Sequence, residues 1–235
     1  GMLTDYPGAT LLQAKGSRLR LVMETDGSLS LIASKKSNVR NPDDLKGKNI
    51  SVSGNTFVEY ATDEVMKRAC LHPGEVNKPE INNIPLRLMM LEDGQISASF
   101  LPGPATAIAL NNGHTALLNT RQMGLRCTGI VFSEKAITEK DEEIRRFITG
   151  YNLGVKYLQT RPQNKWTEIL VKEFGLQEKA AMQIDLPDYR PATRPSYHDI
   201  EKIIAWLKSK GAIPDYYPGE NLVDTTFIPG TLKPQ

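Results

Sequence analysis

Residues 41–56 read NPDDLKGKNISVSGNT, and this stretch predicts a short helical turn, a strand and the start of a longer helix in direct succession. Asn41 is a typical N-cap, and Pro42 suits the first position of a helical turn. The apolar segment 49–52 predicts a buried strand, and the polar turn after it leads into a helix expected from Thr56. A strand that passes through a tight turn into a helix is typical of α/β proteins.

The same alternation of strands and helices extends in both directions from this stretch. Strands are predicted where apolar and β-branched residues cluster, at 19–23, 29–33, 81–84, 96–101, 115–118 and 127–132. Helices are predicted where apolar residues recur at helical spacing, at 57–69, 86–92, 105–110, 144–158, 166–174 and 197–207. Asp26-Gly27 is predicted to be the turn between the first two strands. The alternation between Asp44 and Asn119 predicts a mostly parallel α/β lobe.

The composition argues against several classes of protein. Among 235 residues, 29 are basic and 27 acidic, and so small a positive excess argues against a nucleic-acid partner, which would need a concentrated basic face. The 40% share of hydrophobic residues is ample for a buried core. No apolar run approaches the roughly 18–20 residues that span a bilayer, and no signal peptide is recognisable.

The turn Ser53-Gly54-Asn55-Thr56 is the first candidate ligand-binding segment. Unpaired N–H groups at a helix N-terminus carry partial positive charge and can hold an anion or a carbonyl group. Ligands of open α/β sheets tend to bind beyond the carboxyl ends of the strands, which is where this turn is expected. An ordinary capped helix would have the same sequence, and that alternative stays open.

Two further segments are candidates for ligand contact: Leu101, Pro102 and Gly103, and Thr4, Asp5 and Tyr6. The first follows a predicted strand and opens a helix. Its proline stiffens the turn, and its glycine would let a ligand or another backbone approach closely. A proline-rich helix start is the alternative. The second segment offers an aromatic face and a hydroxyl group, with a frayed chain start as the alternative.

Sequence signatures of enzymes and metal sites are missing. The chain contains no phosphate-binding loop, nucleophile elbow, zinc-protease motif or dinucleotide-binding motif. Cys70 and Cys127 match no metal or redox spacing and are predicted to be buried free thiols, with a disulfide as the alternative. The histidines His72, His114 and His198 lie far apart in the sequence. We therefore predict no enzyme activity, no metal site and no cofactor.

Taken in order, these segments resemble the nitrate/sulfonate/taurine-type, thiamine-precursor-like family of periplasmic substrate-binding proteins, which serve ABC transporters. The most specific match is residues 44–48, which resemble the family's D-L-K-G-K segment at the start of the second lobe. Residues 91–98 resemble the family's L-x-x-G-x-V-D-A, and residues 29–36 resemble the strand that leaves the first lobe. The resemblance covers about residues 3 to 210.

The resemblance implies a periplasmic-binding-protein type II fold, with two α/β lobes that are joined by a hinge and close on a ligand. Residues 1–34 and 128–235 would form the first lobe and residues 35–127 the second. The hinge would lie near Ser34 and near Thr128-Gly129. Matched position by position, the family's ligand contacts fall on the three candidate segments above.

The function implied by the resemblance is the capture of a small, anionic or heteroaromatic molecule for an ABC importer. The partners would be that ligand and the transporter's membrane permease. The location would be periplasmic, or membrane-anchored and extracytoplasmic. Two alternatives stay open: an enzyme on the same fold, of thiamine-pyrimidine or menaquinone pathway type, and a ligand-sensing remnant.

The sequence departs from the family's pattern in two respects. Ser97 and Gly103 stand where the family has acidic residues, which leaves the ligand class open. The strand–helix–strand unit with which the family normally begins is expected to be missing, because residue 3 already matches a point well inside the first lobe. Pairing with a second copy as a homodimer could compensate for an exposed edge.

Overall fold

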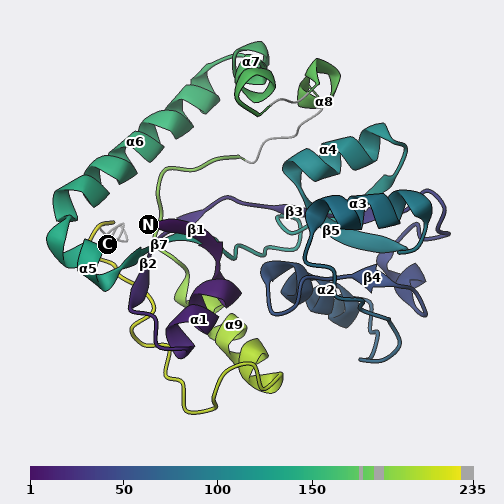
Figure 1. Ribbon diagram of the computed structural model, residues 1–235, viewed down its shortest axis with the longest axis horizontal. Coiled ribbons are helices and arrows are strands. Elements are labelled where there is room, and N and C mark those ends of the chain that lie inside the picture. The colour runs from purple at the N-terminus through teal and green to yellow at the C-terminus, as the bar shows by residue number, and fades with distance from the viewer. Residues whose placement is uncertain (175–176, 183–187, 229–235) are drawn as a thin grey trace, which may run out of the picture. The chain divides into compact units, whose positions relative to one another are not determined.

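The computed structural model describes residues 1–174, 177–182 and 188–228 (Figure 1). The chain divides into two compact units, each of which has its own sheet. The first unit comprises Gly1–Gly27, Arg126–Thr160 and Asp188–Gln235, and the second comprises Ser28–Leu125 and Arg161–Pro187.

The first unit is built on a three-stranded antiparallel sheet in the order β1-β7-β2. Its strands are β1 (Met2–Asp5), β2 (Leu19–Thr25) and β7 (Thr128–Ser133). Its helices are α1 (Tyr6–Ala14), α5 (Glu134–Glu139), α6 (Asp141–Thr160) and α9 (Tyr197–Ser209). Helix α1 packs beside α9 (Figure 1). The apolar face of α6 closes the core, where Ile144 and Ile148 pack in one cluster with Val22, Met23 and Phe227.

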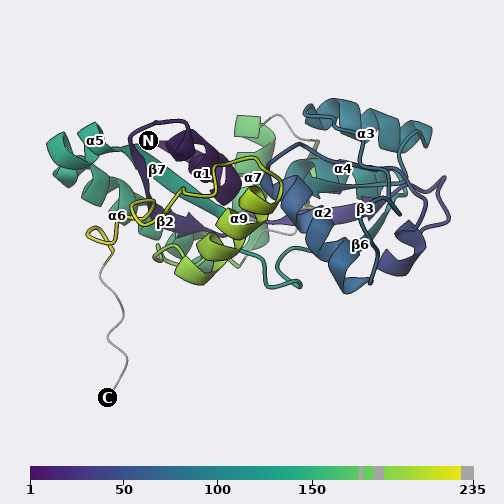
Figure 2. The same ribbon diagram turned by 90° about the horizontal axis from the view of Figure 1, so that it is seen from below.

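The second unit is built on a four-stranded mixed sheet in the order β4-β5-β3-β6. Its strands are β3 (Leu29–Ala33), β4 (Ile50–Ser51), β5 (Ala98–Pro102) and β6 (Thr115–Asn119). Its helices are α2 (Phe57–Arg68), α3 (Ile84–Asp93), α4 (Gly103–Asn111), α7 (Gln163–Phe174) and α8 (Glu178–Met182), with a 3₁₀ turn at Pro42–Leu45. Helices α3 and α4 lie on one face of the sheet and α2 on the other (Figure 1 and Figure 2).

The direction of the strands agrees only in part with the predicted parallel lobe. Strands β4 and β5 pair in parallel, and β6 runs in the same direction because both β5 and β6 are antiparallel to β3. Strand β3, which arrives from the first unit, lies between β5 and β6. The sheet is therefore mixed, although the strands that follow Asp44 are parallel to one another.

The predicted hairpin around Asp26-Gly27 is wrong. Strand β2 pairs with β7, and β3 pairs with β5 and β6, so the two strands belong to different sheets. The turn residue Asp26 is buried, and its carboxylate binds Arg126 and Arg190. The dipeptide thus marks the passage of the chain from one unit to the other, because each strand buries its apolar side chains within its own unit.

The boundaries of the two units differ from the lobe boundaries expected from the sequence. The chain leaves the first unit after Gly27 and returns to it at Arg126. The expected hinge positions lie inside the units: the Ser34 hydroxyl is buried and donates to the Leu91 carbonyl, and Thr128-Gly129 pairs on both sides within β7. Residues 28–34 and 161–187 belong to the second unit, whereas the sequence had assigned them to the first lobe.

Helix starts follow the predicted capping residues. Asn41 and Asp44 form a reciprocal capping box around the 3₁₀ turn, and the Ser196 side chain caps α9. The predicted strand at 81–84 is wrong, because Asn83 accepts a hydrogen bond from the first turn of α3 and starts that helix. Cap residues therefore mark the starts of the 3₁₀ turn, α3 and α9.

Candidate ligand-binding site

Side chains at the start of α2 form hydrogen bonds with the backbone of the same segment. The Thr56 hydroxyl accepts from the Val58 N–H (3.2 Å) and donates to the Ser53 carbonyl (2.8 Å). Asn55 lies in the left-handed region with φ 55°, and its N–H donates to the Glu59 carboxylate (2.8 Å). A buried carboxylate therefore already occupies the place at this helix start where a bound anion was expected.

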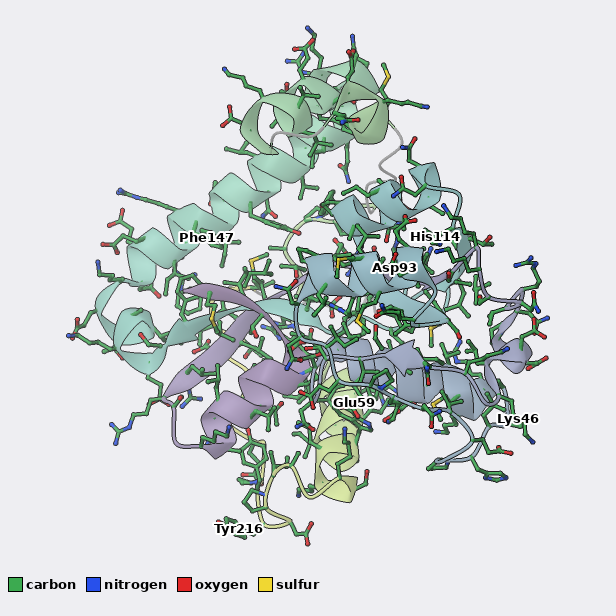
Figure 3. All side chains as sticks on the ribbon, turned by 45° about the vertical axis from the view of Figure 1, so that its right-hand side comes forward. Lys46, Glu59, Asp93, His114, Phe147 and Tyr216 are labelled. Carbon is green, nitrogen blue, oxygen red and sulfur yellow. The ribbon has the colours of Figure 1, made fainter. Side chains whose placement is uncertain are left out.

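Glu59, which is labelled in Figure 3, comes from the first turn of α2 and is held there by a lysine. The Lys78 ammonium lies 3.3 Å from Glu59 Oε1 and 2.7 Å from Asp63 Oδ1. Burial lowers the pKa of Lys78, but hydrogen bonds and charge attraction to the two carboxylates outweigh burial and leave the pKa above its ordinary value. The α2 start thus carries a complete internal ion-pair network.

The remaining polar groups of this turn contact the extended segment before α3. The Ser53 hydroxyl donates to the Asn82 side chain (2.7 Å), and Asn82 donates to Glu80 (3.0 Å). A Cβ at Gly54 would lie 2.7 Å from Glu80 Oε1, so a side chain here would require the end of the Glu80 side chain to move. The four predicted residues 53–56 therefore lie together, with most of their hydrogen-bonding groups engaged.

The start of α4 has a different character. Pro102 is its N-cap, and among the described residues no side chain caps this helix. Pro104 has no N–H to offer, and the Thr106 hydroxyl donates to the Leu101 carbonyl (3.0 Å). No described atom would lie within 4 Å of a Cβ placed on Gly103, so the helix start faces open space.

The two strand ends of the second unit are brought to the same edge of the sheet. Ser51 of β4 pairs in parallel with Ser99 of β5, and the candidate segments 53–56 and 101–103 follow directly. Parallel strands deliver their carboxyl ends to one edge, which is where α/β proteins bind ligands. The sequence-based grouping of these two segments therefore agrees with the geometry of the sheet.

In the first unit, the segment Thr4-Asp5-Tyr6 is ordered by pairing and capping. Strand β1 pairs with β7, and Asp5 caps α1 by accepting from the Gly8 N–H (2.7 Å). Tyr6 is fully buried, and its hydroxyl donates to the Glu24 carboxylate (3.1 Å). Burial, with the nearby Glu24 charge, raises the pKa of Tyr6 far above its ordinary value. Fraying, the alternative considered for this segment, does not occur.

Glu24 belongs to a buried network at the carboxyl end of β2. Arg190 Nη2 lies 2.6 Å from Glu24, and Arg190 Nε lies 2.8 Å from Asp26 Oδ1, which Arg126 also approaches to 2.8 Å. Burial raises the pKa of Glu24, although hydrogen bonds and charge attraction from Arg190 act in the opposite direction. These ion pairs hold the segment around residue 190, where the chain has returned to the first unit, against the end of β2.

The family model described as NMT1/THI5 like matches residues 5–165, which is more than half of the chain. The chain belongs to the NMT1/THI5-like family. No protein of curated function matches it in sequence.

Solved structures with the same fold include binding proteins and an enzyme. The periplasmic aliphatic sulphonate binding protein SsuA from Escherichia coli has a TM-score of 0.79 at 14% identity, with 99% of this chain and 78% of that chain covered. A zinc-bound ligand-binding component of an ABC-type import system from Staphylococcus aureus has a TM-score of 0.77 at 14% identity, covering 96% and 78%. The desulfurization enzyme DszB has a TM-score of 0.66 at 12% identity, covering 96% and 82%. The predicted periplasmic-binding-protein fold of two α/β lobes is thus confirmed.

Three groups that lie beside the candidate segments of this NMT1/THI5-like chain were not predicted from the sequence. Glu59 was detectable from the pattern Thr56-x-x-Glu59, which is the signature of a capped helix start. Arg87 was detectable as a cation on the apolar face of α3, next to Leu88 and Leu91. The Glu24 and Arg190 pair had no local signal, because the two residues are remote in sequence.

Other features of the NMT1/THI5-like chain lie away from the predicted segments. A hollow of about 360 Å³ is lined by residues of α7 and α8, and none of the predicted site residues lines it. Among the described residues, no group of three His, Cys, Asp or Glu side chains could hold a metal ion. Within the same residues, no helix combines the length and apolar character needed to cross a membrane.

Replacing the α2 cap is expected to weaken the fold of this NMT1/THI5-like protein. Thr56→Ala removes the acceptor for the Val58 N–H and the donor to the Ser53 carbonyl. We expect the free energy of unfolding to fall by about 1 kcal/mol in urea denaturation. Thr56→Ser keeps the hydroxyl and should lose less than half of that amount. Equal losses in both variants would contradict the capping role.

Proposed function

We propose that the protein captures a small molecule outside the cytoplasm and delivers it to the membrane permease of an ABC importer. The fold shared with the Escherichia coli sulphonate binding protein and with the Staphylococcus aureus component of an import system supports this proposal. The observation that carries it is the start of α4, which has no side-chain cap and faces open space at Gly103. Free backbone donors at the carboxyl edge of a parallel strand pair are suited to a ligand.

The ligand that fits these donors is small and anionic or heteroaromatic. N–H groups at a helix start bind oxyanions, carbonyl oxygens and ring nitrogens, all of which accept hydrogen bonds. The capped α2 start then acts as a rigid wall beside the ligand, since Glu59 and Thr56 already satisfy its donors. In this arrangement the α4 start binds the ligand, and the α2 start at the same edge of the sheet borders it.

An enzyme on the same fold is the second candidate, because DszB shares this fold. The two cysteines give it little support. Cys127 is a buried free thiol, as predicted, and burial raises its pKa well above the ordinary value, which opposes formation of a nucleophilic thiolate. Cys70 is also free but exposed, contrary to the prediction, and it lies in the other unit. Binding without chemistry therefore remains the better-supported function.

A thermal-melt screen tests the proposal. The panel contains nitrate, sulfonates, thiamine precursors, flavins and amino acids. A ligand at 100 times its dissociation constant should stabilise the fold by roughly 2.7 kcal/mol and raise the melting temperature by about 5–10 °C. A selective shift supports capture, and the absence of any shift across the panel contradicts it.

Blocking the open space at the α4 start provides a sharper test of the same proposal. Gly103→Leu should leave the melting temperature of the free protein within about 2 °C, because a Cβ at this position would meet no described atom within 4 Å. The same side chain should remove the ligand-induced shift by filling the space that the ligand needs. Gly154→Leu, at an equally open glycine of α6, is the matched control and should keep the shift. Full ligand response in Gly103→Leu would exclude this helix start as the site.

A further inference from the structure

Arg87 is a buried cation at the point where β4 and β5 separate. It lies in the first half of α3, and only 2% of the residue is exposed. The ladder between β4 and β5 ends at the pair Ser51–Ser99, and the next carbonyl on β5, that of Phe100, accepts a hydrogen bond from Arg87 Nη1 (3.0 Å). The guanidinium group therefore lies near the carboxyl ends of the two strands.

The charge of Arg87 is not compensated within the described part of the chain. Its Nε is buried and has no hydrogen-bond partner there, and no carboxylate there forms an ion pair with it. Burial alone lowers the pKa of Arg87, with no acidic neighbour acting in the opposite direction. Buried cations in folded proteins are normally paired, so an unpaired one calls for an anion from elsewhere.

The surroundings of Arg87 offer further hydrogen-bond donors without acceptors. The Ser51 hydroxyl is buried and has no partner among the described residues. The start of α4, three residues beyond Phe100, has no side-chain cap. The α2 start at the same edge differs, since the Glu59 carboxylate already fills it. The carbonyl that binds Arg87 and the uncapped start of α4 are therefore only three residues apart along the chain.

We propose that Arg87 selects an oxyanion group on the ligand, and that this group binds between the Arg87 guanidinium and the start of α4. The inference rests on the proposed function and gives it a ligand class: a small molecule that carries a sulfonate, carboxylate or phosphate group. A guanidinium presents a planar array of donors that matches such groups, and charge-assisted hydrogen bonds are stronger than neutral ones.

The test compares Arg87→Met with Arg40→Met in the full chain. Arg40 is an exposed arginine of the same unit whose Nη1 also donates to a main-chain carbonyl, that of Val39 (3.3 Å). Each protein is melted in sodium methanesulfonate, inorganic phosphate and acetate at constant ionic strength, and with an uncharged pyrimidine. We expect at least one oxyanion to raise the melting temperature of the wild type. Arg87→Met should weaken that oxyanion's affinity about 10- to 100-fold, with no change in Arg40→Met.

A second readout separates recognition from a purely structural role. Since Arg87→Met removes an unpaired buried charge, the free variant should melt no lower than the wild type. A lower melting temperature with an unchanged oxyanion response would overturn the proposal. The proposal would also be overturned if the uncharged pyrimidine were the one compound that raised the melting temperature, and raised it equally in wild type and Arg87→Met. Ligand capture itself would then still stand. No shift with any compound would count against both.

Discussion

Gly129→Ala is expected to lower the free energy of unfolding of the first unit by about 3 kcal/mol. A Cβ at Gly129 would lie 2.7 Å from the Met23 carbonyl oxygen and 3.0 Å from Leu21 Cδ2. Strand β7 is the central strand of its sheet, so neither neighbouring strand can move away without breaking the pairing. Urea denaturation monitored by circular dichroism measures the loss.

Gly150→Ala is the matched control for this substitution. Gly150 lies in the middle of α6, and no described atom would come within 4 Å of its Cβ. Alanine is the better helix former, so this variant should gain about 0.5–1 kcal/mol. A loss below 1 kcal/mol in Gly129→Ala would show that β7 and β2 can separate more easily than their contact implies.

Arg190→Met is expected to destabilise the first unit by about 2–3 kcal/mol at pH 8. The side chains of Glu24 and Asp26 are about 95% buried, and Arg190 binds both. Asp26 keeps Arg126 as a partner, whereas the hydrogen bond that remains to Glu24 among the described residues is that of the Tyr6 hydroxyl. The value is below that for a fully buried ion pair, since the Arg190 side chain is 38% exposed and water screens it.

The effect of Arg190→Met should depend on pH. In the wild type, burial holds the pKa of Glu24 above its ordinary value, so its contribution to stability is largest below that value and is lost as the pH rises. Removing Arg190 raises this pKa further, because the arginine was lowering it. The gap in unfolding free energy between wild type and variant should therefore narrow from pH 8 to pH 5. A gap that is constant with pH would contradict the role of Glu24.

Arg146→Met controls for the loss of an arginine. Arg146 pairs with Glu142 across one turn of α6, and both side chains are about three-quarters exposed. Exposed pairs of this kind contribute little, so the variant should lose no more than about 0.5 kcal/mol. A loss of about 0.5 kcal/mol or less in both variants would mean that the pairing of Arg190 with the two carboxylates contributes little to stability.

Local sequence patterns predicted most elements of the fold but not which strands pair. Helix α9 and the 3₁₀ turn at Pro42–Leu45 begin at the caps expected for them, because capping is a contact between near neighbours. The Asp26-Gly27 hairpin failed because turn chemistry only permits a pairing. The pairing itself is decided by which sheet buries each strand, and β7 lies far along the chain from β2.

As with the fold, only part of the candidate site could be predicted from the sequence. The segments 53–56 and 101–103 were identified because a strand end followed by a helix start is visible in the sequence. The difference between their helix starts was not identified, because it depends on Glu59 folding back onto Asn55 and on Pro102 lacking a capping side chain. The unpaired state of Arg87 requires knowledge of every neighbour, which only the folded chain supplies.

The pairing of β1 with β7 has a consequence for how the chain folds during synthesis. Met2 pairs with Val131, so strand β1 leaves the ribosome long before its partner strand β7 has been made. The four strands of the second unit are complete by Asn119 and can form their sheet earlier. Strand β1 therefore stays unpaired while the sheet of the second unit can already form, and during this period a chaperone has the most to protect.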